Sequence, residues 1–206
     1  MKKILTLSFT LCFVFAVNYS QAQARIGLKA GLNLSTMTLK ESGMSLDPKT
    51  MTGFHVGLIS EIPLNDKLFF QPGILYSTKG SKYSVSGMDV SITPSFVEVP
   101  VNVLFKSDLG SAKLLLFAGP YFAFGIGGDV KSPSDTKAIS YGSGDQKDMK
   151  SFDFGLNFGA GVEVSNFQIT AQYGLGLSNL APVTTNSAEM KVRTIGISVA
   201  YLFGGK

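Results

Sequence analysis

The side chains that could do acid–base or nucleophilic chemistry in this 206-residue chain are few. His55 is the one histidine, and Ser95, Glu98 and Asp153 are the residues that a fold could bring near it. A hydrolase of the lipase or protease type needs a histidine beside a nucleophile, with a third group that orients the ring. No His-x-Ser arrangement fixes a nucleophile beside His55. We therefore expect no enzymatic activity, and a hydrogen-bonded structural role for His55.

Motifs for metals, cofactors and nucleic acids are also missing. A single cysteine, Cys12, excludes a cysteine-based zinc site and a disulfide scaffold. Residues 145–148 (DQKD) lack the carboxylate spacing of a calcium loop, and residues 125–128 (GIGG) lack the third glycine and the helix of a dinucleotide loop. The formal net charge of +4 is small and dispersed, without the basic cluster of a nucleic-acid-binding surface. We expect no metal, no cofactor and no nucleic-acid partner.

The first 24 residues have the layout of a secretory signal peptide. Two lysines precede an uncharged apolar stretch at residues 4–17, and small residues follow at Ala22 and Ala24. The apolar stretch is shorter than the roughly 20 residues that a membrane-spanning helix needs. We expect export, cleavage after Ala22 or Ala24, and a single mature domain at residues 25–206 without any cysteine.

Apolar and polar residues alternate with a period of two, the signature of β-strands, along most of the mature chain. We expect eight strands, at residues 25–34, 54–62, 68–79, 97–105, 113–127, 152–164, 167–177 and 195–203. The alternation is less clean in 68–79 and 113–127 than in the other six. The connections are long and short in turn. The long ones are 37–49, 80–89, 129–150 and 179–191, and the short ones are 65–67, 107–111 and 165–166. This order is typical of outer-membrane barrels, which have short periplasmic turns and longer extracellular loops.

The polarity of the two strand faces distinguishes a membrane barrel from a soluble one. One face carries large Phe, Leu and Tyr residues, whereas the other is rich in Gly, Asn, Gln and Thr with isolated charges. Most lysines lie in the connections. This favours an apolar exterior in lipid and a polar interior. We predict an all-β, eight-stranded antiparallel up-and-down transmembrane β-barrel. A soluble lipocalin-like barrel that binds a small apolar ligand is the alternative.

Four segments resemble those of the PorT-like outer-membrane β-barrel proteins of Gram-negative bacteria. Residues 70–80 (FQPGILYSTKG) are similar to the family's "LQPELLYSxKG" strand, and residues 96–101 (FVEVPV) to its "YxEIPL" strand. Residues 117–121 (FAGPY) resemble "xAGP", and residues 25–34 resemble the opening "GxKxGxNxS" strand. Gly73 stands where the family often has Glu, so no role of that carboxylate is carried over. The resemblance implies a porin-like outer-membrane barrel, or an accessory factor for secretion or envelope assembly.

An eight-stranded barrel has a lumen only wide enough for side chains to fill. We expect a structural polar network there, made of Arg25, Lys29, Glu61, Glu98, Asn102, Asp153, Asn157 and Glu163. Buried charges need partners, so a cluster of Arg25, Lys29, Glu61 and Glu163 is expected near the periplasmic side. Its role would be a plug that holds the barrel in register. A narrow ion path is the other interpretation.

These expectations combine into one functional hypothesis. The chain would be a small monomeric barrel of the outer membrane, with a structural or surface-interaction role in the cell envelope, and not an open diffusion porin. Its partners would be outer-membrane lipid and an envelope or extracellular protein, contacted through loops 37–49 and 129–150. Residues 129–150 form the longest connection, rich in Ser, Gly, Asp and Lys. They would act as a mobile cap or as a recognition surface.

Overall fold

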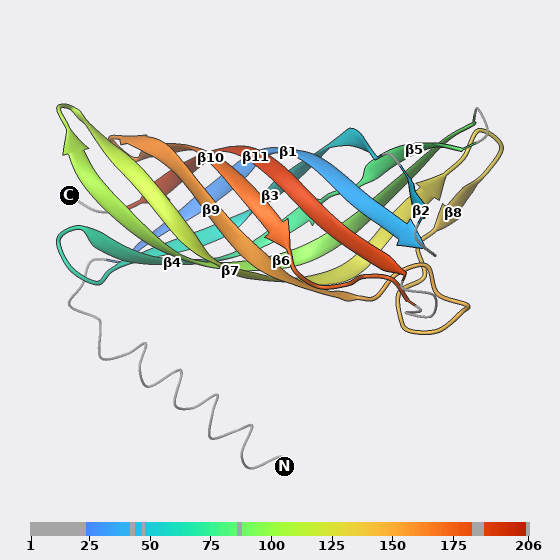
Figure 1. Cartoon of the computed structure of the whole chain (residues 1–206). Helices are drawn as coiled ribbons and strands as arrows, with labels where there is room; N and C mark the ends of the chain where they lie inside the picture. Colours follow the sequence, from blue (N-terminus) through green and yellow to red (C-terminus); the bar gives the residue numbers. More distant parts are fainter. Residues whose placement is uncertain (1–23, 42–43, 47, 86–87, 183–187, 205–206) are drawn as a thin grey trace, which may run out of the picture.

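The structure, a computed structural model, describes residues 24–41, 44–46, 48–85, 88–182 and 188–204. The expected signal peptide lies outside these residues, except for Ala24. The described residues contain no helix that is long and apolar enough to cross a membrane. They form one sheet of eleven strands (Figure 1). The strands are β1 (Arg25–Glu41), β2 (Met44–Leu46), β3 (Lys49–Pro63), β4 (Leu68–Thr78), β5 (Ser81–Val85), β6 (Met88–Leu109), β7 (Ala112–Lys131), β8 (Thr136–Ala138), β9 (Phe152–Val164), β10 (Phe167–Gly176) and β11 (Glu189–Phe203).

Eight of these strands close into a barrel. Strands β1, β3, β4, β6, β7, β9, β10 and β11 pair antiparallel in chain order, and β11 returns to pair with β1. Ile26 has Phe203 of β11 as its partner on one side and Ser60 of β3 on the other. The predicted eight-stranded antiparallel up-and-down barrel is confirmed.

The two ends of the barrel differ (Figure 1). At one, the turn end, short turns at residues 64–67, 110–111 and 165–166 join the strands. At the other, the loop end, the wall continues well beyond the roughly 9–11 residues that cross a bilayer, since β6 has 22 residues and β7 has 20. Residues 80–89, expected as a loop, are mostly strand, because β5 pairs with the beginning of β6 and satisfies its backbone groups there.

The outward face of the barrel is apolar. In β11 the odd positions from Ile195 to Phe203 point outward, and their side chains are 36–56% exposed. The even positions from Thr194 to Leu202 are buried and include Ser198. This inverts the arrangement of a soluble protein, in which large apolar side chains face the interior. An exterior of this kind is stable only against lipid, so the apolar face is the membrane-facing one.

Aromatic side chains lie at both borders of this apolar band. Near the turn end, the Tyr201 ring lies 4.9 Å from those of Phe167 and Phe203. Towards the loop end, Phe124 and Phe152 pack at 5.2 Å between ring centroids. Aromatic girdles of this kind mark the two interfaces of a membrane barrel.

Candidate functional site: the filled lumen

The turn end of the lumen is closed by a cluster of charged and amide side chains from six strands. Its members, here the turn-end cluster, are Arg25 of β1, Glu61 of β3, Gln71 of β4, Lys106 of β6, Glu163 of β9 and Gln168 of β10. Lys106 Nζ lies 2.7 Å from Glu61 Oε1 and 2.6 Å from Glu163 Oε2. The Arg25 guanidinium binds both carboxylates as well, and lies 2.8 Å from Glu163 Oε1.

Six of the eight barrel strands therefore meet in the turn-end cluster, each through one side chain. Two cations face two carboxylates, so the cluster is electrically neutral. Gln168 Nε2 donates to Glu61 Oε2 and to Glu163 Oε2, each at 2.8 Å, and Gln71 Nε2 donates to Gln168 Oε1 at 3.2 Å. The Lys106 ammonium also lies 4.5 Å from the centroid of the Phe69 ring. Buried ions are tolerated only with this degree of pairing, because each has lost its hydration.

The middle of the lumen is filled by further polar side chains. Lys29, expected in the cluster with Arg25, lies apart from it, and its Nζ donates to Gln172 Oε1 at 3.2 Å. The reason is its position four residues further along β1, about 13 Å from Arg25 towards the loop end. Lys79 forms an ion pair of 2.5 Å with Glu98, and Tyr121 donates to Asp153 Oδ2 at 2.9 Å.

His55 lies in this middle layer, but none of the three residues considered as its partners forms a hydrogen bond with it. Its Nδ1 lies 2.9 Å from Asn33 Oδ1 and its Nε2 lies 2.8 Å from Ser198 Oγ. A hydroxyl, imidazole and amide in series could activate a serine nucleophile. All three side chains are at most 3% exposed, and the His55 ring packs so closely on Gly31 that a Cβ there would lie 2.7 Å from it. This packing leaves no room for a substrate and supports a structural role.

The inward side chains pack closely in the middle of the lumen. The cavity among Asn33, His55, Glu98, Asn157 and Thr194 has a volume of about 10 Å³. This is room for about one water molecule. Asn102 is buried in the same lumen. The packing of the described residues thus gives a plugged barrel.

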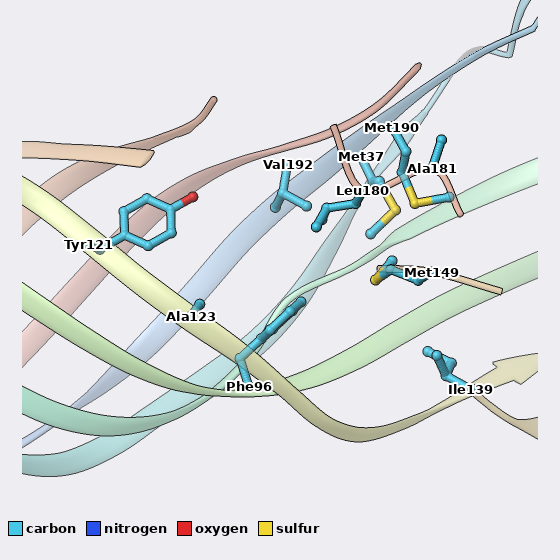
Figure 2. Packing of buried hydrophobic residues seen from close by; sticks show 10 residues of the cluster. All are labelled: Met37, Phe96, Tyr121, Ala123, Ile139, Met149, Leu180, Ala181, Met190 and Val192. Atoms are coloured by element: carbon cyan, nitrogen blue, oxygen red, sulfur yellow. The ribbon is translucent and has the colours of Figure 1, made fainter. Parts of the chain in front are cut away.

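The loop end of the lumen is closed by apolar side chains, which the sequence analysis did not predict. Ten buried residues form this apolar plug (Figure 2): Met37, Phe96, Tyr121, Ala123, Ile139, Met149, Leu180, Ala181, Met190 and Val192. Six come from the barrel wall, two come from the connection at residues 132–151, and two come from residues 177–182, which follow β10. These described segments therefore fold back into the mouth of the barrel.

Hydrogen bonds fix the longest connection in this position. The Tyr141 hydroxyl donates to Gly127 O at 2.9 Å, and Lys150 N donates to Leu180 O at 2.9 Å. Asp148 Oδ2 accepts a hydrogen bond of 2.8 Å from Ser140 N, and Asp148 Oδ1 lies 3.1 Å from Lys137 Nζ. The hydrogen bond from Ser140 N and the Lys137 ammonium lower the pKa of Asp148. These contacts make residues 129–150 a fixed cap on the barrel mouth and not the mobile cap considered above.

The structure thus brings Arg25, Glu61 and Glu163 together and places Lys29 elsewhere. It places Glu98, Asn102, Asp153 and Asn157 inside the lumen, buried. Sequence reasoning missed Lys106 and Lys79 as members of the network. The sequence does contain a signal for Lys106. It is at an even position of the same strand as Glu98 and Asn102, so it lies on the same polar face.

Comparison with known proteins agrees with this architecture. The family model described as "Outer membrane protein beta-barrel domain" matches residues 19–181. No curated protein matches the sequence.

Several solved outer-membrane barrels are similar to this chain. The outer membrane protein OprG from Pseudomonas aeruginosa has 10% identity and a TM-score of 0.50, covering 89% of this chain and 97% of OprG. Neisserial surface protein A has 14% identity and a TM-score of 0.45, covering 85% of this chain and 96% of its own. Ail, the attachment invasion locus protein of Yersinia pestis, has 18% identity and a TM-score of 0.43, covering 88% and 99%. At these identities the similarity concerns the fold alone.

Proposed function

Because this chain belongs to the outer membrane protein beta-barrel domain family, we propose that it is a closed barrel with a structural or surface-interaction role in the Gram-negative cell envelope. The observation that carries this proposal is the filling of the lumen from both ends. The turn-end cluster occupies one end and the apolar plug occupies the other. A diffusion porin needs a water-filled path instead, which barrels of about 16 strands provide.

The orientation follows from the general architecture of outer-membrane barrels. Their short turns face the periplasm and their longer connections face the outside. The turn end is then periplasmic and the loop end extracellular. Export would depend on the N-terminal signal peptide at residues 1–24, with the mature domain at residues 25–206.

The part of the wall that continues beyond the membrane supports a role at the cell surface. Strands β6 and β7 carry a sheet outward, and residues 132–151 are held on it by Tyr141 and Asp148. An ordered surface of this kind suits contact with an envelope or extracellular protein. The β1–β11 pairing closes the barrel and leaves no open barrel edge for a second copy, which supports a monomer.

A strain of the native bacterium that lacks this chain tests the proposal. We expect the strain to become more sensitive to detergents, and the wild-type chain to restore resistance. Uptake of small sugars should be the same in both strains. Slower sugar uptake without the chain, at unchanged detergent sensitivity, would instead identify a porin.

Two alternatives have distinct outcomes in the same strains. An accessory role in secretion or envelope assembly, which the PorT-like resemblance implies, would give a stable envelope complex that co-purifies with the chain and a secretion defect without it. Binding of a small apolar ligand would require displacement of the apolar plug, and a bound apolar molecule would be recovered by extraction of the purified protein.

A further inference from the structure

The outer wall of the barrel carries a hollow at its loop end. Its volume is about 490 Å³. It lies between the beginning of β9 and the segment that follows β10, and it is lined by Ser143, Lys150, Ser151, Phe152, Ser178 and Asn179. The lining combines one cation, several hydroxyl groups and one aromatic ring. These groups suit a polar molecule that carries both hydroxyls and negative charge.

The hollow lies at the border of the membrane-facing band. Phe152, which forms part of its lining, is 43% exposed and packs against Phe124 of the aromatic girdle. Leu177, one residue before Ser178, is 44% exposed on the same outward face. Side chains below the hollow therefore face acyl chains, whereas the hollow itself lies at the level of lipid headgroups.

A second cation lies on the same outward wall. Arg193 of β11 is exposed, two residues beyond the lipid-facing Ile195, and its register partner in β10 is Leu175. Arg193 lies further towards the turn end than the hollow. Its partner Leu175 pairs with Leu156 of β9, which is six residues from Lys150, so the two cations lie about 20 Å apart on the outer wall. In the described part of the chain, no carboxylate forms an ion pair with either side chain, whereas the neighbouring Lys191 lies 2.7 Å from Glu189.

The backbone at the hollow is fixed. Lys150 N donates to Leu180 O at 2.9 Å, and Gly125 N donates to Ser151 O at 2.7 Å. The cation is thus presented from an ordered segment, so that less conformational entropy is lost when a ligand binds.

We propose that this hollow binds the headgroup of a phosphorylated glycolipid of the outer leaflet. Lys150 binds a phosphate group in the hollow, Arg193 binds a second one outside it, the serine hydroxyls bind the sugar, and Phe152 and Leu177 contact the acyl chains. Arginine and lysine are the side chains that recognise phosphate, and basic sites beside a bilayer bind anionic headgroups. The inference rests on the orientation given under the proposed function, with the loop end facing outward.

Native mass spectrometry of the folded protein in non-ionic detergent tests this inference. The probes are bisphosphorylated lipid A, its dephosphorylated form, and phosphatidylethanolamine. We expect a one-to-one complex with bisphosphorylated lipid A. Affinity should fall roughly fivefold in Lys150→Gln or Arg193→Gln and about 30-fold in the double variant, as for about 1 kcal/mol per cation beside a membrane.

Lys137→Gln is the matched control, because Lys137 lies in the same connection but is paired with Asp148. It should bind lipid A as the wild type does. Equal binding of the dephosphorylated form, or unchanged binding by the double variant, would overturn the proposal and indicate unspecific lipid contact. Heat-modifiable migration of each variant on a gel checks folding. A closed lumen is measured independently by conductance, so failure of lipid binding leaves the proposed function standing.

Discussion

Lys106 Nζ lies 2.7 Å from Glu61 Oε1, although the two residues are 45 positions apart in the chain and β4 lies between their strands. Lys106 also reaches Glu163 of β9, across β7. These ion pairs therefore cross the lumen rather than follow the sheet. They connect strands that share no backbone hydrogen bonds, so they fix the cross-section of the barrel at its turn end.

Removal of one carboxylate from this cluster should be costly. In Glu61→Gln, the buried Lys106 and the partly buried Arg25 have one charged partner fewer. We expect the free energy of unfolding to fall by about 3–5 kcal/mol, the usual cost of breaking a buried ion pair. Urea unfolding of the protein in lipid vesicles measures this change.

Glu189→Gln is the control for that substitution. Glu189 pairs with Lys191 at 2.7 Å, but this pair lies at the surface. The Glu189 side chain is 34% exposed and the Lys191 side chain is 42% exposed. A surface pair contributes about 0–1 kcal/mol. An equal loss of stability in both variants would contradict the account of the turn-end cluster.

The apolar plug should respond to truncation as a protein core does. Leu180 is fully buried in the plug, whereas Leu109 is 61% exposed at the turn end. Leu180→Ala should lower the free energy of unfolding by about 2–5 kcal/mol through lost burial and a cavity. Leu109→Ala should change it by at most about 0.5 kcal/mol. A negligible effect of Leu180→Ala would mean that the connection does not pack in the mouth.

Two neighbouring glycines allow a matched test of how the cap is held. A Cβ on Gly125 would lie 2.2 Å from the Tyr141 ring, whereas a Cβ on Gly127 would meet nothing within 4 Å. Gly125→Ala should displace Tyr141 and increase the rate of trypsin cleavage after Lys137 and Lys147. Gly127→Ala should be cleaved at the wild-type rate. Equal rates of trypsin cleavage in the two variants would show that Tyr141 does not hold the cap in place.

Acid should loosen the cap through Asp148. Its pKa is lowered in the folded protein, so the stabilisation is fully present above the unfolded pKa and is lost as pH falls through the folded one. Hydrogen exchange of the Ser140 amide, which donates to Asp148 Oδ2, reports this change. Its protection should hold above about pH 4 and decline in more acidic solution. Asp148→Asn should remove the pH dependence, and persistence of the same profile in that variant would assign it to another group.

The barrel could be predicted from the sequence because period-two alternation depends only on neighbours in the chain. The same parity places Glu61, Glu98 and Glu163 on the inward faces of three strands. Alternation does not give the relative heights of residues on different strands, which depend on register. For this reason Lys29 was expected beside Glu61, and Lys106 was not.

The apolar plug could not be predicted in the same way. Ile139, Met149 and Leu180 lie in connections with no period, and their burial depends on where those connections fold. Phe96 and Val192 are apolar residues on the inward face. Two residues closer to the turn end, the same face carries the polar side chains of Glu98 and Thr194. Such apolar residues mark the level where a lumen changes from polar to apolar filling.

The closed lumen is tested most directly by the conductance of the purified chain in planar lipid bilayers. We expect no current steps above the background of the bilayer in the wild type. An open porin, inserted in the same bilayer, gives the positive control. Stable, salt-dependent current steps from the wild-type chain would contradict the account, because they require a continuous water path through both the turn-end cluster and the apolar plug.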